Sequence, residues 1–162
     1  MTNTALRSLD LKWLEEPVWP PEDHNGLARV QKEGGIATAA GENAMLPEFK
    51  SMFEAGAITY AQPSVTKVGG VTQMRKVMAL ADAHGVSVVP HSAYFGPGLL
   101  ASIHCVAAMP KGCLVERYDA EFAVNPLHDA IHPDSKGCIA VPQGPGLGID
   151  PDLKVVEELR VF

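Results

Sequence analysis

Short apolar runs that end in polar residues recur along this chain, and they predict a parallel α/β architecture. The clearest run, Ile36 to Asn43, consists of small or apolar residues followed by Gly-Glu-Asn. A short apolar run closed by turn residues is typical of a strand buried on both faces of a parallel sheet. Four other runs have the same form, at residues 12–15, 58–61, 86–89 and 113–115.

A polar residue follows each run at a nearly constant interval. These residues are Glu15, Glu42, Ser64, His91 and Glu116, which lie 27, 22, 27 and 25 positions apart. The interval accommodates one strand and one helix, so each polar residue falls at the carboxyl end of a strand, where barrel enzymes carry their catalytic groups. Taken singly, each glutamate is more commonly a helix-capping or solvent-facing residue; their corresponding positions favour a common site.

The segments between the runs predict helices over residues 25–34, 47–56, 71–84 and 98–109. Asn25 is expected to cap the first helix, and Pro47 to occupy the first turn of the second. The third helix is expected to turn one apolar stripe towards the sheet, made of Val71, Met74, Met78 and Ala81.

Alternating strands and helices of these lengths predict a parallel sheet with right-handed crossovers. Five strand-helix steps are fewer than the eight of a closed barrel, which needs roughly 200 residues or more. The sequence therefore predicts an open sheet or an incomplete (β/α) barrel over residues 11–116. Residues 1–10 are expected to form a lead or remnant helix. Residues 117–162 are expected to form a loop-rich tail with a short strand at 138–141 and a terminal helix at 152–159.

Composition narrows the class of protein. A chain of 162 residues with 46% hydrophobic residues can bury the core of one domain. It contains no apolar run of membrane-spanning length and no signal-peptide pattern at its N-terminus. The formal net charge of −6 argues against a nucleic-acid surface. The apolar runs and the charge together mean that neither a membrane nor a nucleic acid is expected as a partner. Three cysteines without zinc-ligand spacing favour reduced thiols and a cytoplasmic location.

Five short motifs carry a family resemblance. In order they are WLEEP at 13–17, GEN at 41–43, QPSVTKVGG at 62–70, PHS at 90–92 and VER at 115–117. Each motif is weak alone, but their order and spacing together resemble the C-terminal half of the mandelate racemase and muconate lactonising enzyme family, within the enolase superfamily. The resemblance runs from about residue 11 to residue 152. It implies that the strands correspond to about the last five of a TIM-type (β/α)8 barrel.

The resemblance also implies a magnesium-dependent racemase, epimerase or dehydratase that removes a proton next to the carboxylate of a small hydroxy acid or sugar acid. Glu15 and Glu42 would be oxygen ligands of Mg²⁺, and Glu16 a neighbouring turn acid. His91 would be the general base, because imidazole side chains titrate near neutral pH. Glu116 would donate a hydrogen bond to the substrate carboxylate as it becomes an enediolate, which requires a protonated, partly buried carboxyl group.

Two departures from the family pattern affect this implied site. Ser64 stands where members of the family carry an aspartate or a catalytic lysine. A serine can hydrogen-bond His91 but cannot stabilise an imidazolium by charge, although Lys67 can place a positive charge nearby. The family's third metal carboxylate and its lysine base lie on earlier strands, which this chain is expected to lack. Magnesium binding is therefore expected to be weak or absent.

Alternatives from other classes remain open. The chain could be a truncated, catalytically inactive fragment that self-associates, or a metal-independent binding domain in which Glu15 and Glu42 point away from each other. An unclosed sheet leaves two edges with unpaired backbone groups, which recruit partners unless they are covered. The sequence therefore predicts a homo-oligomer, most simply a two-fold dimer. Tyr94 and Phe95 could shape a pocket, although aromatic packing beneath a loop is more common.

Overall fold

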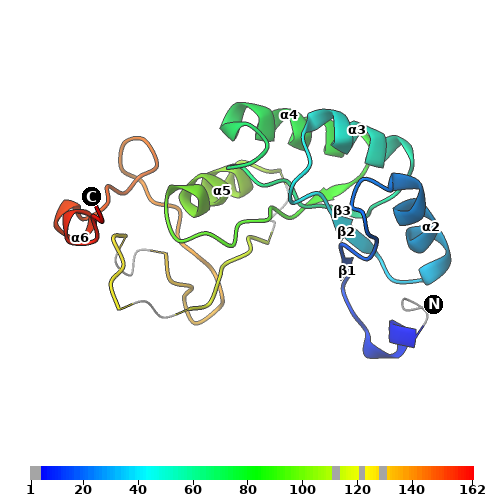
Figure 1. The fold of residues 1–162 in the computed structure, drawn as a ribbon, viewed down its shortest axis with the longest axis horizontal. Helices are drawn as coiled ribbons and strands as arrows, with labels where there is room; N and C mark the ends of the chain where they lie inside the picture. Colours follow the sequence, from blue (N-terminus) through cyan, green and yellow to red (C-terminus); the bar gives the residue numbers. More distant parts are fainter. Residues whose placement is uncertain (1–4, 111–113, 121–122, 128–130) are drawn as a thin grey trace. The chain divides into compact units, whose positions relative to one another are not determined.

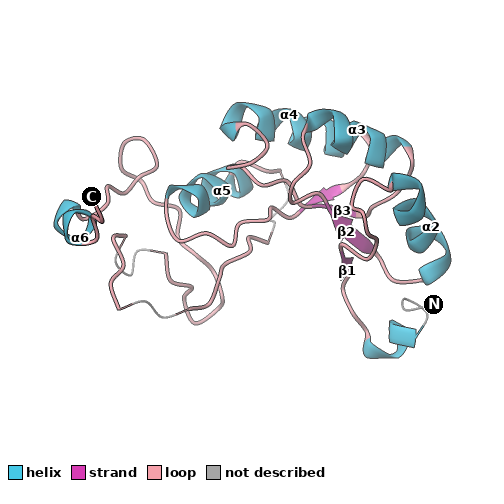
Figure 2. Cartoon of the chain, in the orientation of Figure 1, coloured by secondary structure: helices cyan, strands magenta, loops and turns pink. Residues whose placement is uncertain are grey.

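A computed structural model of the protein describes residues 5–110, 114–120, 123–127 and 131–162 (Figure 1). The chain divides into two compact units, Met1–His91 and Ser92–Phe162. The first unit holds the sheet and the second holds a helix followed by loop-rich chain (Figure 2). In the part of the chain that the structure describes, no helix is long and apolar enough to cross a membrane.

The first unit is built on a four-stranded parallel sheet in the order β1-β2-β3-β4. Its strands are Leu14–Glu15, Thr38–Ala40, Tyr60–Ala61 and Ser87–Val88. Each strand pairs with the next one along the chain, as in successive steps of a (β/α) barrel. The predicted parallel α/β fold is therefore confirmed, with four strands in the described sheet.

Three helices connect these strands and lie on one side of the sheet (Figure 1). They are α2 (His24–Gly34), α3 (Leu46–Glu54) and α4 (Gly70–Ala83). The predicted cap of the first helix was wrong by two residues, because the carboxylate of Asp23 accepts the Gly26 backbone N–H at 2.8 Å. Before β1, a short 3-10 turn, η1 (Arg7–Leu9), lies in the segment expected to be a lead or remnant helix.

The core of the first unit lies between the helices and the sheet. From α3 it takes Phe49, Met52 and Phe53, and from α4 it takes Met74, Val77 and Ala81. The predicted stripe of α4 was wrong at Val71, which is 45% exposed, and it omitted Val77, which is fully buried. The helix begins at Gly70, so Val71 lies in its first turn, and the buried row starts one turn later.

A polar cluster joins helix α2 to β2 and to Thr59, the residue before β3. The Oε1 atom of Gln31 accepts the backbone N–H of Thr38 at 2.7 Å, and its Nε2 atom donates to the Thr59 hydroxyl at 2.7 Å. The buried Thr38 hydroxyl lies 2.7 Å from Gln31 Oε1 and 2.8 Å from the Ala57 carbonyl oxygen. These bonds fix the position of β2 at the start of the strand, before the chain reaches Glu42.

The second unit has its own core around α5 (Pro97–Ala107). Leu99, Leu100 and Ile103 of this helix are buried together with Leu127 and Ile131. Near the C-terminus, in the segment expected to be helical, lies α6 (Leu153–Glu158), which the side chain of Asp152 caps.

Two predicted strands of the second unit are not strands in the described residues. Residues 138–141 follow a tight turn that joins Asp134 to Cys138. The Asp134 carboxylate accepts the Cys138 backbone N–H, and the Asp134 backbone N–H donates to the Cys138 carbonyl oxygen. At 114–116 the Ser92 hydroxyl donates to the carbonyl oxygen of Glu116. At both places the backbone groups bond to these residues and not to a neighbouring strand, and Cys113 lies outside the described residues.

Candidate acid-base and metal site

The polar residues predicted from the first unit lie at one edge of the sheet. Glu15 is the last residue of β1, and Glu42 follows β2 by two residues. Ser64 follows β3 by three residues, and His91 follows β4 by three residues. Because the strands are parallel, all four positions lie beyond the same, carboxyl, edge.

Glu15 is held by two donors. Its Oε2 atom accepts from Gln62 Nε2 at 2.7 Å and from Trp13 Nε1 at 3.2 Å. Gln62 is buried and follows β3 directly, so its amide reaches across β2 towards the end of β1. The Glu15 side chain itself is exposed, which leaves its carboxylate accessible to a ligand from solvent.

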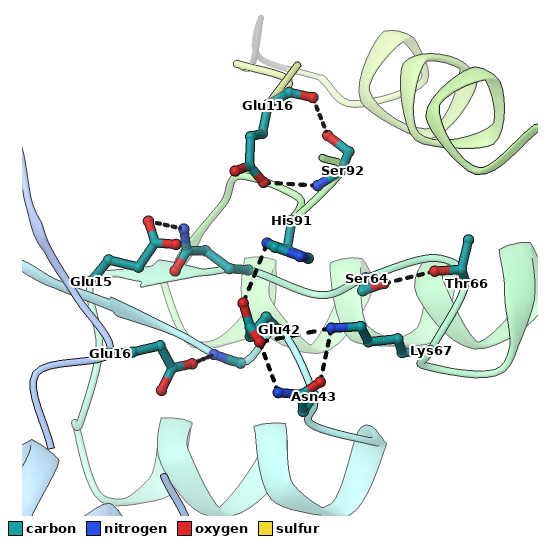
Figure 3. A network of polar contacts seen from close by, with 12 residues as sticks. Glu15, Glu16, Glu42, Asn43, Ser64, Thr66, Lys67, His91, Ser92 and Glu116 are labelled. Atoms are coloured by element: carbon teal, nitrogen blue, oxygen red, sulfur yellow. Dashed lines mark hydrogen bonds and ion pairs between the residues drawn. The ribbon is translucent and has the colours of Figure 1, made fainter. Parts of the chain in front are cut away.

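Glu42 lies between two basic side chains (Figure 3). Its Oε2 atom is 3.5 Å from His91 Nδ1, and its Oε1 atom is 3.7 Å from Lys67 Nζ. Asn43 Nδ2 donates to the same Oε1 at 2.8 Å, while Lys67 Nζ donates to Asn43 Oδ1 at 2.8 Å. The carboxylate of Glu42 is therefore partly neutralised by groups of this chain.

Glu16 has a different environment from Glu15. Its Oε1 atom accepts the backbone N–H of Gly41 at 2.8 Å, which ties the end of β1 to the end of β2. Its φ of 42° lies in the left-handed region and turns the chain sharply after Glu15. The turn directs the two adjacent carboxylates to different partners, as expected for a turn acid.

Ser64 begins the turn that carries Lys67. Its carbonyl oxygen accepts the backbone N–H groups of Lys67 at 3.0 Å and Val68 at 2.8 Å. Its fully buried hydroxyl lies 3.1 Å from the Thr66 hydroxyl. The turn brings the Lys67 ammonium group to Glu42, so the positive charge expected near the site lies against that carboxylate.

Glu116, in the second unit, is clamped by Ser92. Its Oε2 atom accepts the Ser92 backbone N–H at 3.0 Å, and its backbone carbonyl oxygen accepts the Ser92 hydroxyl at 2.6 Å (Figure 3). Ser92 is fully buried and Glu116 is half-buried. These two hydrogen bonds hold both the backbone and the side chain of Glu116 in place.

These residues fit a magnesium site only in part. The carboxylates of Glu15 and Glu42 supply the oxygen ligands that Mg²⁺ prefers, at the ends of neighbouring strands. Within the described ranges, however, no group of three or more His, Cys, Asp or Glu side chains is arranged to hold a metal ion. Lys67 also competes for Glu42. The chain thus offers a partial ligand set.

Sequence reasoning missed three residues that position the predicted ones. Gln62 orients Glu15, Asn43 joins Glu42 to Lys67, and Ser92 clamps Glu116. Each of them belongs to the same short motif as a predicted residue or follows one directly: Gln62 precedes Ser64 by two positions, and Ser92 follows His91. The motifs contain these three residues, but the side chains to which they bond could be identified only in the folded structure.

Comparison with known proteins gives a consistent result. The family model of enolase C-terminal domain-like proteins matches residues 2–155. A 3,6-anhydro-α-L-galactonate cycloisomerase from Streptomyces coelicolor is 32% identical over 97% of this chain and 42% of its own length. A D-xylonate dehydratase from Haloferax volcanii is 31% identical over 95% of this chain and 38% of its own.

Among solved structures, a racemase from Streptomyces coelicolor with bound magnesium is 34% identical, with a TM-score of 0.75 over 97% of this chain and 42% of that protein. The chain thus spans about two fifths of the length of these relatives. The match to nearly the whole chain, the parallel sheet and the order of the motifs agree. This chain belongs to the enolase C-terminal domain-like family, the mandelate racemase and muconate lactonising enzyme group of the enolase superfamily.

Proposed function

We propose that this chain is a C-terminal catalytic segment of a magnesium-dependent enzyme that removes a proton next to the carboxylate of a sugar acid or related hydroxy acid. The observation that carries the proposal is the contact of Glu42 with His91 at the carboxyl edge of the sheet. It joins a candidate metal ligand to a candidate base. The printed names of two relatives, a cycloisomerase of an anhydrogalactonate and a dehydratase of xylonate, support a sugar-acid substrate.

Glu15 and Glu42 are the residues that would hold the magnesium ion. When bound, Mg²⁺ would supply positive charge that stabilises negative charge developing on a substrate carboxylate. Gln62 and Trp13 hold the Glu15 carboxylate in one orientation by their two donated hydrogen bonds. Asn43 donates one hydrogen bond to the Glu42 carboxylate, and Lys67 forms an ion pair with the same oxygen while donating to Asn43.

His91 is proposed to take the substrate proton. Its Nδ1 atom faces a carboxylate, and Glu42 at 3.5 Å supplies negative charge beside an imidazolium at a site where Ser64 supplies none. A proton gained by the ring is therefore stabilised by Coulomb attraction. The family resemblance implies that a protonated Glu116 would donate a hydrogen bond to the substrate carboxylate; within the second unit, the Ser92 backbone N–H holds that side chain in place.

A binding measurement tests this proposal without requiring turnover. Titration calorimetry with D-galactonate is expected to detect binding with 10 mM MgCl2 and to lose it with EDTA, because the substrate carboxylate needs the metal charge. Glu42→Gln is expected to abolish the metal dependence, while Lys50→Gln, which removes an ion pair on the exposed face of α3, is the matched control. Binding that is equal with EDTA would contradict the proposal and favour a metal-independent binding domain.

The isolated chain is expected to show no racemase, epimerase or dehydratase turnover on hydroxy acids. Its described residues supply two carboxylates rather than a group of three metal ligands, and a missing reacting group costs orders of magnitude in rate. Magnesium-dependent turnover by the pure chain that is abolished by His91→Ala would refute this expectation. We further expect a homodimer in a cytoplasmic setting.

A further inference from the structure

The second unit contains a cavity of about 530 Å³ that the acid-base site does not use. This volume lies within the range of small-molecule sites, roughly 300–1,000 Å³. The cavity floor is apolar, because Leu99 and Ile131 of the local core form part of its lining. Tyr94, Phe95 and Tyr118 contribute aromatic side chains to its walls.

Three consecutive residues, Val115, Glu116 and Arg117, have different surroundings. Val115 packs against the core cluster that contains Leu99, and Arg117 lines the cavity next to that cluster. Glu116, between them, is directed to Ser92 instead. The lining residues include neither Glu116 nor Ser92, so the cavity is a candidate site in its own right.

Arg117 gives the cavity its charge preference. Its side chain is 19% exposed, and its guanidinium group donates to Asp119 Oδ1 at 3.1 Å. The Asp119 side chain is 97% exposed, and an ion pair so open to water contributes little free energy. A ligand carboxylate inside the cavity can therefore displace Asp119 and take up the planar fork of donors that suits carboxylates.

The aromatic walls select the rest of the ligand. The rings of Phe95 and Tyr118 meet edge to face, with centroids 5.3 Å apart and an interplanar angle of 85°. A third ring can extend such an arrangement, because aromatic rings prefer edge-to-face or offset contacts. Asn125 and His132 also line the cavity, and His132 Nδ1 lies 3.5 Å from Arg117 Nη2. With its apolar and aromatic lining residues and one guanidinium group, the cavity suits a small molecule with a flat ring and a single negative charge.

We propose that this cavity binds a small aromatic carboxylate, with Arg117 pairing with the carboxylate and the ring lying over Leu99 and Ile131. This binding does not depend on magnesium or on the proposed catalytic residues. The sequence prediction for Tyr94 and Phe95 left a pocket and plain packing open, and both residues line this cavity.

Benzoate titration observed by NMR tests the proposal on the full chain in EDTA. Benzoate is expected to saturate and to give intermolecular NOEs to the methyl groups of Leu99 and Ile131. Benzyl alcohol, which has the ring without the charge, should bind at least about tenfold more weakly, as should benzoate with Arg117→Gln. Arg117→Lys should give an intermediate loss, because it keeps the charge but not the fork.

The controls separate this proposal from the proposed function. Arg75→Gln removes an exposed arginine of α4 and should leave benzoate affinity unchanged, as should Glu42→Gln. Equal binding of benzyl alcohol, no saturable binding, or affinity insensitive to both Arg117 variants would overturn the proposal. Benzoate binding that requires magnesium and is lost with Glu42→Gln would also overturn it, while supporting the metal site. If Arg117→Gln fails to fold, the NOEs of the unmodified chain and Arg117→Lys still decide the result.

Discussion

Removing the positive charge of Lys67 is expected to strengthen magnesium binding. Its Nζ atom lies 3.7 Å from Glu42 Oε1, a carboxylate oxygen that we assign to the metal. A cation approaching Glu42 must displace this ammonium group or tolerate its repulsion. Lys67→Gln keeps a polar side chain of similar reach towards Asn43 but removes the charge, so the competition for Glu42 should fall.

The size of this effect follows from the distance and the exposure. Coulomb's law gives about 1 kcal/mol for unit charges this far apart in water and about 4 kcal/mol at an effective dielectric constant of 20. The two side chains are 38% and 33% exposed, so solvent screening applies and the lower figure is the better guide. A change of about 1 kcal/mol corresponds to about fivefold in affinity.

Calorimetric titration of Mg²⁺ at low ionic strength measures the change. The unmodified chain is expected to bind Mg²⁺ weakly, and Lys67→Gln is expected to bind it about fivefold more tightly. The double variant Lys67→Gln with Glu42→Gln is expected to show no measurable Mg²⁺ binding. Lys50→Gln is the matched control, because Lys50 pairs with Glu54 at 3.4 Å on the exposed side of α3. An unchanged or weaker affinity of Lys67→Gln, or equal gains from both lysine variants, would refute the reasoning.

Three further predictions concern stability and assembly. Gly41→Ala should lower the free energy of urea unfolding by about 3 kcal/mol, because φ is 118° and the new Cβ would lie 2.5 Å from the Phe49 ring. Gly56→Ala is the control: φ is 60° and no atom lies near the new Cβ, so the loss should be only about 1 kcal/mol. Equal losses would contradict the close approach. Thr38→Val should cost about 1–3 kcal/mol by the same assay, because it strands the buried Ala57 carbonyl oxygen; no loss would mean that the polar cluster is dispensable. Sedimentation at micromolar concentration should show a dimer whose interface exceeds about 1,000 Å², and a stable monomer would contradict the argument from open sheet edges.

The sheet could be predicted from sequence because its pattern is local and repeated. Each apolar run ends in turn residues, and Gly35, with φ of 73°, closes the first long helix where the glycine pair indicated. Details that depend on tertiary packing were less accessible. Val71 and Val77 are equally apolar, but Val71 lies in the first turn of α4 and is 45% exposed, whereas Val77 packs into the core.

The candidate site shows the same division. The positions of Glu15, Glu42 and His91 at the carboxyl ends of β1, β2 and β4 follow from the strand pattern, so their shared edge could be predicted. The hydrogen bond from Gln62 to Glu15 joins residues 47 positions apart and depends on the register of three strands. The contact of Lys67 with Glu42 depends on the turn that begins at Ser64. Such contacts are set by the folded backbone rather than by any one motif.

The central claim is that Glu15 and Glu42 together bind a divalent metal at the carboxyl edge of the sheet. Paramagnetic broadening of backbone amide signals by substoichiometric Mn²⁺ tests it most directly, since the effect falls steeply with distance from the ion. We expect the amides around Glu15 and Glu42 to broaden first, and the double substitution Glu15→Gln with Glu42→Gln to remove the effect. Broadening centred on the acidic pair Glu157 and Glu158 of the terminal helix, or broadening that survives the double substitution, would contradict it.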